Sequence, residues 1–271
     1  MGIGEFFSYG FIQRAVLAGS CIALLCSLLG VLLVLRRLSL IGDGLAHVTF
    51  GSVALGLLLR LHPLSVSLPV VMASSLGILK LVEKARLFGD AAIGIVSAVG
   101  IACGIILASV AGGFNVDLFS YLFGNILSIS TTEVMIAMVV SLLALLIIIC
   151  FYNDLLAVSF DEELAKTSGI DTRRINTLLV LSTAVTVVLA MKVVGIMLTS
   201  ALLILPAVTS LQVARGFKNT MVLASVTAVI SVITGICISF LLNLPSGAMV
   251  VIMNFAFFLA ALSFNRLFLK K

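Results

Sequence analysis

Long runs without charged residues dominate the chain. Most of them approach or exceed the roughly 20 apolar residues that a helix needs to cross a bilayer. The stretch 219–265 carries no charge at all, and its segment NLPSG (243–247) has the composition of a turn that divides it into two spans. The pattern predicts nine membrane-spanning helices, or eight if one of the shorter runs is re-entrant. The runs are 15–35, 38–59 (interrupted only by Asp43 and His47), 61–79, 91–116, 134–153, 175–191, 193–214 and the two halves of 219–265.

The composition supports the same interpretation. Of the 271 residues, 62% are hydrophobic and 10% are charged, whereas soluble domains have about 25% charged residues. So few ionic side chains could not cover the surface of a soluble fold, so a soluble enzyme, a nucleic-acid-binding protein and a disordered chain are excluded. No polar stretch is long enough to form a second domain. We therefore expect residues 1–271 to form one all-α, polytopic transmembrane bundle with 8–9 spans.

Lysine and arginine residues indicate the orientation. If the end of the first span that carries Arg36 and Arg37 lies inside, 13 of the 16 basic residues fall on the inner side and 3, namely Arg14, Arg60 and Lys192, on the outer side. This bias predicts a cytoplasmic carboxyl terminus and, for nine spans, an external amino terminus. The five cysteines all lie in apolar runs and form no CxxC pair, so we expect them to be buried packing residues rather than a disulfide or thiolate site.

Asp43 and His47 are the candidate functional residues. They interrupt the second run and lie four positions apart, which puts both side chains on one face of a helix. A carboxylate at membrane depth costs at least about 2.5–3.5 kcal/mol, so it needs a partner or a wet cavity. The pair suits a metal ion, a proton relay or a structural hydrogen bond. Tetrahedral zinc takes four ligands, and the other histidine, His62, lies at the far end of the span, so a twofold dimer would have to supply the second pair.

Four glycines surround this pair: Gly42, Gly44, Gly51 and Gly56. Small residues allow helices to approach closely, so we expect these glycines to mediate helix packing.

Two apolar segments match neither a loop nor a regular span. Segment 118–132 is shorter than a crossing and lies between Asp117 and Glu133, which indicates an interfacial or re-entrant piece over the outer mouth. Segment 191–206 contains Gly195 near its start and Pro206 at its end. It is either a broken helix that lines a cavity or a tight turn followed by a proline kink.

Two short polar segments fall on the inner side. Segment 153–174 contains the sequence FDEELAKTSGIDTRR, and segment 210–220 follows Pro206. They are either solvated connections or docking surfaces for a cytoplasmic partner. The chain has no GxxxxGK[ST] phosphate loop, no HExxH and no GxSxG motif, so no ATP site and no catalytic residues are predicted.

The stretch LRRLSLIGDGLAHVTFGSVALG (35–56) resembles the signature region of permeases of bacterial zinc, manganese and iron ABC importers, the ABC-3 family. The resemblance continues in order through DLFSYLFGNILSIS (117–130), FDEELAKTSGI (160–170), GIMLTSALLILPAVTS (195–210) and NLPSGAMVVI (243–252), and covers nearly the whole chain. The zinc branch looks closest.

The resemblance implies a bundle similar to the type II, cobalamin-type ABC importers in a bacterial inner membrane. It implies a homodimer that pairs with cytoplasmic ATPase subunits and an extracytoplasmic solute-binding protein, has no permanently bound cofactor, and transports Zn²⁺, or Mn²⁺ or Fe²⁺, by alternating access. Asp43 and His47 match the family's metal site. The residues expected in the ATPase-coupling loops are Ser210, Gln212, Arg215, Gly216, Lys218, Glu162, Glu163 and Gly169, and those expected at an outer gate are Asp117, Phe119, Tyr121 and Glu133.

Two alternatives stay open at this point. An ATPase-independent metal or proton secondary transporter would use Asp43 and His47 as a relay. An ABC permease for cobalamin or a siderophore would need no ligands inside the membrane.

Overall fold

The computed structural model describes residues 9–85, 88–113, 116–125 and 129–269, and the regular structure in these ranges is helical. The elements are α2 (Gly10–Leu35), α3 (Ile41–Leu58), α4 (Pro63–Ala85), α5 (Gly89–Val110), α6 (Val116–Phe123), α7 (Thr131–Cys150), α8 (Tyr152–Phe160), α9 (Glu162–Thr167), α10 (Thr172–Val193), the 3₁₀ turn η2 (Ile196–Leu198), α11 (Thr199–Val213), α12 (Phe217–Leu242), α13 (Ser246–Phe264) and the π-helical η3 (Asn265–Leu269).

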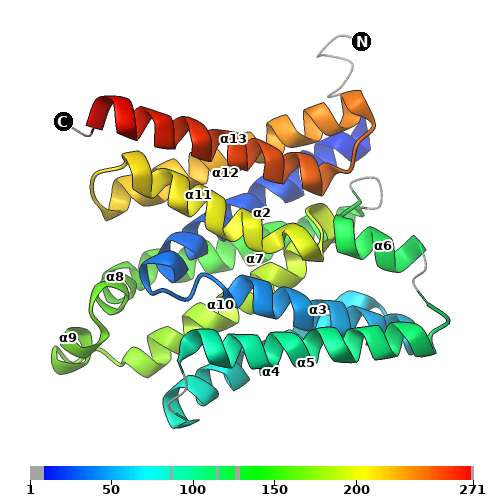
Figure 1. Cartoon of the computed structure of the whole chain (residues 1–271), viewed down its shortest axis with the longest axis horizontal. Helices are drawn as coiled ribbons and strands as arrows, with labels where there is room; N and C mark the ends of the chain where they lie inside the picture. The colour runs from blue at the N-terminus through cyan, green and yellow to red at the C-terminus, as the bar shows by residue number, and fades with distance from the viewer. Residues whose placement is uncertain (1–8, 86–87, 114–115, 126–128, 270–271) are drawn as a thin grey trace.

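Nine helices in the described ranges are long and apolar enough to cross a membrane, which confirms the nine-span prediction. They lie roughly side by side in Figure 1, with the short helices α8 and α9 at one end of the bundle and α6 at the other. Arg36 and Arg37 follow α2 at the end where α9 lies, because Arg36 contacts Glu162 of α9. The excess of basic residues makes this end cytoplasmic, so α6 lies at the outer end.

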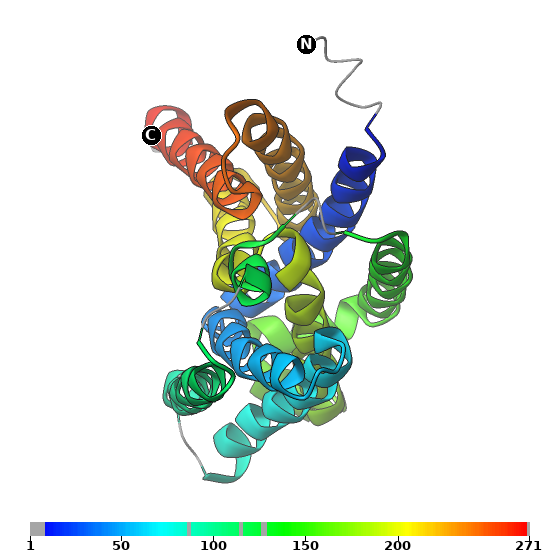
Figure 2. The ribbon, with the colours of Figure 1, turned by 90° about the vertical axis from the view of Figure 1, so that its right-hand side faces the viewer.

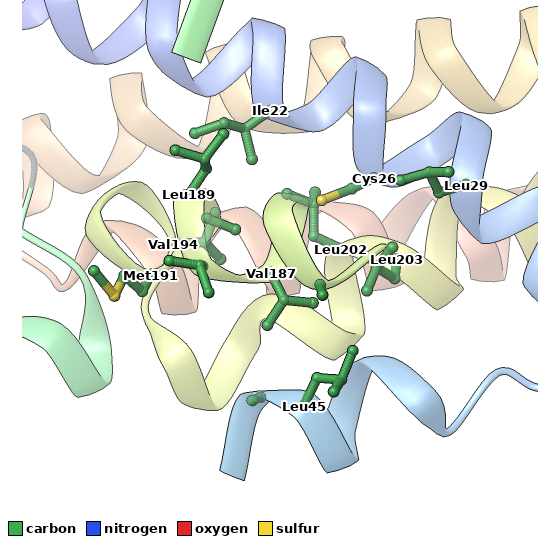
Figure 3. Close-up of a cluster of buried hydrophobic side chains, with 14 of the residues drawn as sticks. Ile22, Cys26, Leu29, Leu45, Val187, Leu189, Met191, Val194, Leu202 and Leu203 are labelled. Carbon is green, nitrogen blue, oxygen red and sulfur yellow. The ribbon is translucent and has the colours of Figure 1, made fainter. Parts of the chain in front are cut away.

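Helices α2, α3 and α10 form the centre of the bundle. About 70% of each of their spans is buried, compared with 22% for α4, α5 and α13. Seen from the outer end, α5 and α7 lie on opposite flanks (Figure 2). Figure 3 shows how side chains of four helices meet in the core: Ile22, Cys26 and Leu29 of α2, Leu45 of α3, Val187, Leu189 and Met191 of α10, and Leu202 and Leu203 of α11 are all buried. The poorly buried helices leave apolar faces for lipid or a partner.

Glycines bring α3 and α5 into backbone contact. A Cβ added to Gly51 would lie 2.8 Å from the carbonyl oxygen of Gly100, and one added to Gly100 would lie 2.8 Å from the amide nitrogen of Val48. Such distances leave no room for a methyl group. The expected packing role is confirmed for all four glycines near Asp43, whose nearest neighbours belong to this same chain: Leu203 for Gly42, Ile93 for Gly44, Gly100 for Gly51 and Pro63 for Gly56.

Segment 191–206 contains a tight turn between two antiparallel spans. Helix α10 ends at Val193, Gly195 adopts φ +95°, and η2 leads into α11. The Thr199 hydroxyl donates a hydrogen bond to the Gly195 carbonyl oxygen at 2.7 Å, which satisfies a backbone acceptor away from water. Pro206 lies inside α11 rather than at its end. The tight turn of the second alternative is therefore present.

Segment 118–132 starts within the short helix α6, and its interfacial or re-entrant position stays a prediction. A Cβ at Gly124, just after α6, would lie 2.8 Å from the Val193 carbonyl oxygen, and one at Gly247 would meet the carbonyl oxygens of Val194 and Phe123. The end of α6, the α10–α11 turn and the start of α13 thus touch through their backbones. We call this contact the outer junction.

All five cysteines are free. Cys26 is buried as expected, but Cys103 and Cys150 are exposed on the isolated chain. The prediction that all five are buried is wrong, because α5 and α7 turn much of their surface away from the protein.

Candidate functional site

Asp43 and His47 lie side by side on α3. Asp43 is in the first turn of the helix, and its Oδ2 atom lies 3.4 Å from Nε2 of His47. The Asp43 side chain is 47% exposed and that of His47 is 20% exposed. Every other residue between Ile41 and Ala54 is buried. The helix is thus enclosed except where these two polar groups face outward, so both are accessible to an ion or to a second chain.

The surrounding structure fixes the direction of both side chains. The positive end of the α3 dipole lies at the first turn and favours the Asp43 carboxylate. A Cβ at Gly100 would lie 3.0 Å from the carbonyl carbon of His47, so α5 packs directly against the backbone that carries the imidazole. A Cβ at Gly44 would lie 2.7 Å from Ile93. Close packing behind α3 therefore holds Asp43 and His47 on its free face.

One chain supplies two ligands here. No group of three or more histidine, cysteine, aspartate or glutamate residues that could hold a metal occurs among the described residues. His62 is exposed just before α4, after the end of α3. A carboxylate and an imidazole are ligands that Mn²⁺, Fe²⁺ and Zn²⁺ all accept, but a four-ligand site needs two more groups.

At the cytoplasmic end, a buried arginine binds α9. Nη2 of Arg36 donates a hydrogen bond to Oε2 of Glu162 at 2.9 Å, and Nδ2 of Asn176 in α10 donates to Oε1 of the same carboxylate at 2.8 Å. The Arg36 side chain is 8% exposed. Burial lowers the pKa of its guanidinium, and the Glu162 carboxylate opposes this shift. Glu162 thereby links α2, α9 and α10.

The other coupling residues predicted in this region are on the surface. Glu163 is exposed on α9, and Gly169 adopts φ +88° in the exposed turn that follows it. Asp161 caps α9 by accepting a hydrogen bond from the amide of Leu164 at 3.0 Å. A helix of six residues is marginal by itself, so the cap and the Glu162 network hold α9 in place.

The segment around the α11–α12 turn is partly exposed. Arg215, Gly216 and Lys218 are exposed. Gln212 accepts a hydrogen bond from Nδ2 of Asn265 at 3.0 Å. Ser210 is fully buried, and its hydroxyl donates to the Ala207 carbonyl oxygen, so it points into the bundle.

An aromatic cluster joins the two cytoplasmic segments. Phe217, at the start of α12, lies 5.5 Å from Tyr152 and 6.3 Å from Phe160, measured between ring centroids. The segments 153–174 and 210–220, which are far apart in sequence, therefore form one surface at the end of the bundle where α8 and α9 lie in Figure 1.

The predicted gate residues occupy different environments. Phe119 is exposed and stacks on Phe123 at a centroid distance of 6.2 Å, whereas Tyr121 is buried. The Glu133 carboxylate accepts a hydrogen bond from the Ser130 amide at 2.9 Å and completes a capping box for α7. The Asp117 side chain lies outside the described part of the structure. The sequence alone did not reveal the structural role of Glu133, although the spacing S-x-x-E is a capping signal.

Sequence reasoning also missed Arg36 and Asn176. Arg36 counted only as a topological charge, and Asn176 carried no motif. Their contacts with Glu162 are separated by 126 and 14 positions. No local pattern predicts such pairing.

Comparisons with known proteins agree with these features. The sequence pattern of the ABC 3 transport family matches residues 8–265. The manganese transport system membrane protein MntC of Listeria innocua is 32% identical over 94% of this chain and 91% of its own length. The high-affinity zinc uptake system membrane protein ZnuB of Haemophilus influenzae is 30% identical over 92% of this chain and 95% of its own. The expected likeness to the zinc branch is thus not supported.

Solved structures give the same fold. A chain of PsaBC from Streptococcus pneumoniae, in complex with a Fab, has a TM-score of 0.82 and 32% identity, and covers 96% of this chain and 95% of its own. A metal-chelate type ABC transporter in an inward-facing conformation has a TM-score of 0.76 at 16% identity over 93% of this chain and 85% of its own, which is a likeness of fold alone. The chain belongs to the ABC 3 transport family and is a multi-pass membrane permease subunit of a bacterial ABC transporter.

Proposed function

We propose that this permease imports a divalent transition metal, Mn²⁺ or Zn²⁺, and that Asp43 and His47 bind the ion in transit. The observation that carries the proposal is the position of this pair: it is the accessible polar spot on an otherwise buried stretch of α3. The relatives named for manganese and for zinc transport support a metal cargo. Two oxygen or nitrogen ligands per chain favour transient binding, because no thiolate cage would retain the ion.

A homodimer would complete the ion site. Two copies related by a twofold axis would contribute two carboxylates and two imidazoles. Helix α5 provides a suitable interface, since Ala91, Gly94, Ala98 and Ala102 are exposed along one face of it. A Cβ at Gly94 would meet no atom of the described chain within 4 Å. In membranes, small residues at this spacing let a second helix approach closely.

The cytoplasmic surface is the proposed docking site for the ATPase subunits. Phe160 and Leu164 are exposed there, and Phe88 has 88% of its surface exposed. Phe88 and Phe160 line a cavity of about 780 Å³ that also includes Glu162. An exposed aromatic patch at a polar rim is typical of a protein interface.

Two residues that line the same cavity each have an unpaired polar atom. Oγ of Ser159 and Oδ1 of Asn176 are buried and have no hydrogen-bond partner among the described atoms. Both residues line the cavity. Unpaired buried polar atoms are costly, so a rearrangement of this end on docking that paired them would be favourable. ATP-driven movement of the docked subunits would then act on α9 and, through Glu162, on α2 and α10.

At the outer end, the solute-binding protein would deliver the ion beside α6. We propose that the segment with Phe119, Tyr121 and Glu133 closes the outer mouth. The outer junction ties this segment to α13 and to the α10–α11 turn, so the mouth opens only when these helices move together. The ATPase-independent carrier that the sequence left open disagrees with membership of an ABC family. A chelate cargo has no support, because the metal-chelate transporter shares only the fold.

Metal uptake by cells that carry the whole transporter tests the proposed site. Asp43→Ala and His47→Ala should each reduce uptake of Mn²⁺ or Zn²⁺ to that of cells without the permease, while the ATPase still co-purifies. His62→Ala, which removes an exposed histidine away from the pair, should keep wild-type uptake. Undiminished uptake in both site variants would refute the proposed route.

A linked dimer tests whether the two copies share one site. A tandem fusion with one wild-type half and one half carrying Asp43→Ala and His47→Ala should transport no metal if the four ligands act together. Uptake at half the rate of the wild-type tandem would instead indicate two independent sites.

A further inference from the structure

A long apolar groove runs along α3, α4 and α5. It has a volume of about 790 Å³, and its floor is formed by α3 residues such as Val48 and Leu55. The groove exists because α4 and α5 both pack on α3, where Gly51 and Gly100 allow close contact, rather than filling the space between each other.

The dimensions of the groove match a lipid tail. On α4 the part of its lining from Val70 to Lys80 is about 15 Å long at a rise of 1.5 Å per residue. The hydrocarbon of one leaflet is about 15 Å deep. Since these helices cross the membrane, the groove lies in hydrocarbon, and an apolar space of this size would be unfavourable for water and costly to leave empty.

A lysine lies near the cytoplasmic end of the groove. Lys80 lines it near the end of α4, is exposed, and forms no ion pair with any described carboxylate. Lysines at this depth extend their ammonium group to the headgroup region. The rest of the lining is uncharged. A cation at one end of an apolar channel complements a molecule with an anionic head and a hydrocarbon tail.

We propose that this groove binds one acyl chain of an anionic phospholipid from the cytoplasmic leaflet, with Lys80 contacting the phosphate of the headgroup. The lipid would fill the space between α4 and α5 and brace α3 on the side that carries Val48 and Leu55. The proposal does not depend on the identity of the transported metal.

Two variants separate the tail from the headgroup. A Cβ at Gly77, which lines the groove, would meet no atom within 4 Å, so Gly77→Leu places a side chain in the groove without a backbone clash. Lys80→Gln removes the charge and leaves the groove open. Gly10→Leu at the outer end of α2 is the matched control, because Gly10 also faces open space but lies outside the groove.

Native mass spectrometry of the purified full chain, after exposure to mixtures of phosphatidylglycerol and phosphatidylcholine, measures the retained lipid. Wild type and Gly10→Leu should retain phosphatidylglycerol in preference to phosphatidylcholine. Lys80→Gln should reduce this preference about fivefold, the ratio that corresponds to about 1 kcal/mol per basic residue at an anionic surface. Gly77→Leu should lose both lipids. Ser74→Leu, at a second groove position, should repeat the result of Gly77→Leu and guards against a folding defect.

Two outcomes would overturn the proposal. Equal retention of phosphatidylglycerol by wild type and every variant would show that the lipid binds elsewhere. Loss of the dimer in Gly77→Leu and Ser74→Leu, with lipid retention unchanged in the remaining monomer, would show that a second copy of the chain occupies the groove.

Discussion

Replacing Glu162 by Gln should release α9 from the bundle while keeping the size of the side chain. The change removes the negative charge that faces Arg36, whose side chain is 8% exposed, and weakens the contact with Asn176. Breaking a buried ion pair costs about 3–5 kcal/mol, and breaking an exposed pair costs about 0–1 kcal/mol. Because Glu162 itself is 48% exposed, we expect an intermediate loss of about 2 kcal/mol, which corresponds to a factor of about 30 in an equilibrium constant.

Hydrogen–deuterium exchange of the purified permease measures this effect directly. The amides of α9 should exchange about 30-fold faster in Glu162→Gln than in wild type, because α9 opens locally when its charged anchor is lost. Co-purification of the ATPase should fall in parallel. Glu163→Gln is the matched control, since it removes the same charge from an exposed position one residue further on. Equal exchange rates in the two variants would refute a structural role for the Arg36–Glu162 pair.

Two further predictions concern helix packing and capping. Gly100→Ala should destabilise the permease by about 1–3 kcal/mol and lower metal uptake, because the new methyl group would meet the amide of Val48 at 2.8 Å. Gly77→Ala, where the space is open, should not lower the thermal unfolding midpoint in detergent, because alanine favours a helix over glycine. A similar midpoint for both variants would contradict the close contact. Ser130→Ala should lower the free energy of unfolding by about 1 kcal/mol, because the hydroxyl of Ser130 accepts a hydrogen bond from the amide of Glu133 at 3.2 Å in the α7 cap. An unchanged unfolding midpoint in detergent would show that the cap does not stabilise the permease.

Much of the architecture could be predicted because the membrane makes the sequence pattern simple. A charge-free run of sufficient length specifies a span, and basic residues between runs specify the side. The same reasoning placed Asp43 and His47 on one helix face, which the structure confirms. A four-residue spacing on a helix is a local property, so the sequence contains it directly.

Features that depend on contacts between distant segments could not be predicted. The partners of Gly44 and Gly51 lie on α5, and nothing near them in sequence specifies Ile93 or Gly100. The exposed cysteines show a related limit: hydrophobicity indicates a span, but it does not tell which face of that span meets protein and which meets lipid. The buried position of Ser210 follows from the rotation of α11, which the short polar segment around it concealed.

Helix α13 begins at the outer junction, where Gly247 touches the backbone of Val194 and Phe123. It ends at the cytoplasmic side, where Asn265 is hydrogen-bonded to Gln212. A displacement at either end is therefore transmitted across the bilayer by one continuous helix. We therefore expect the two ends of the permease to move together through this rigid helix, rather than through independent motion of a loosened segment.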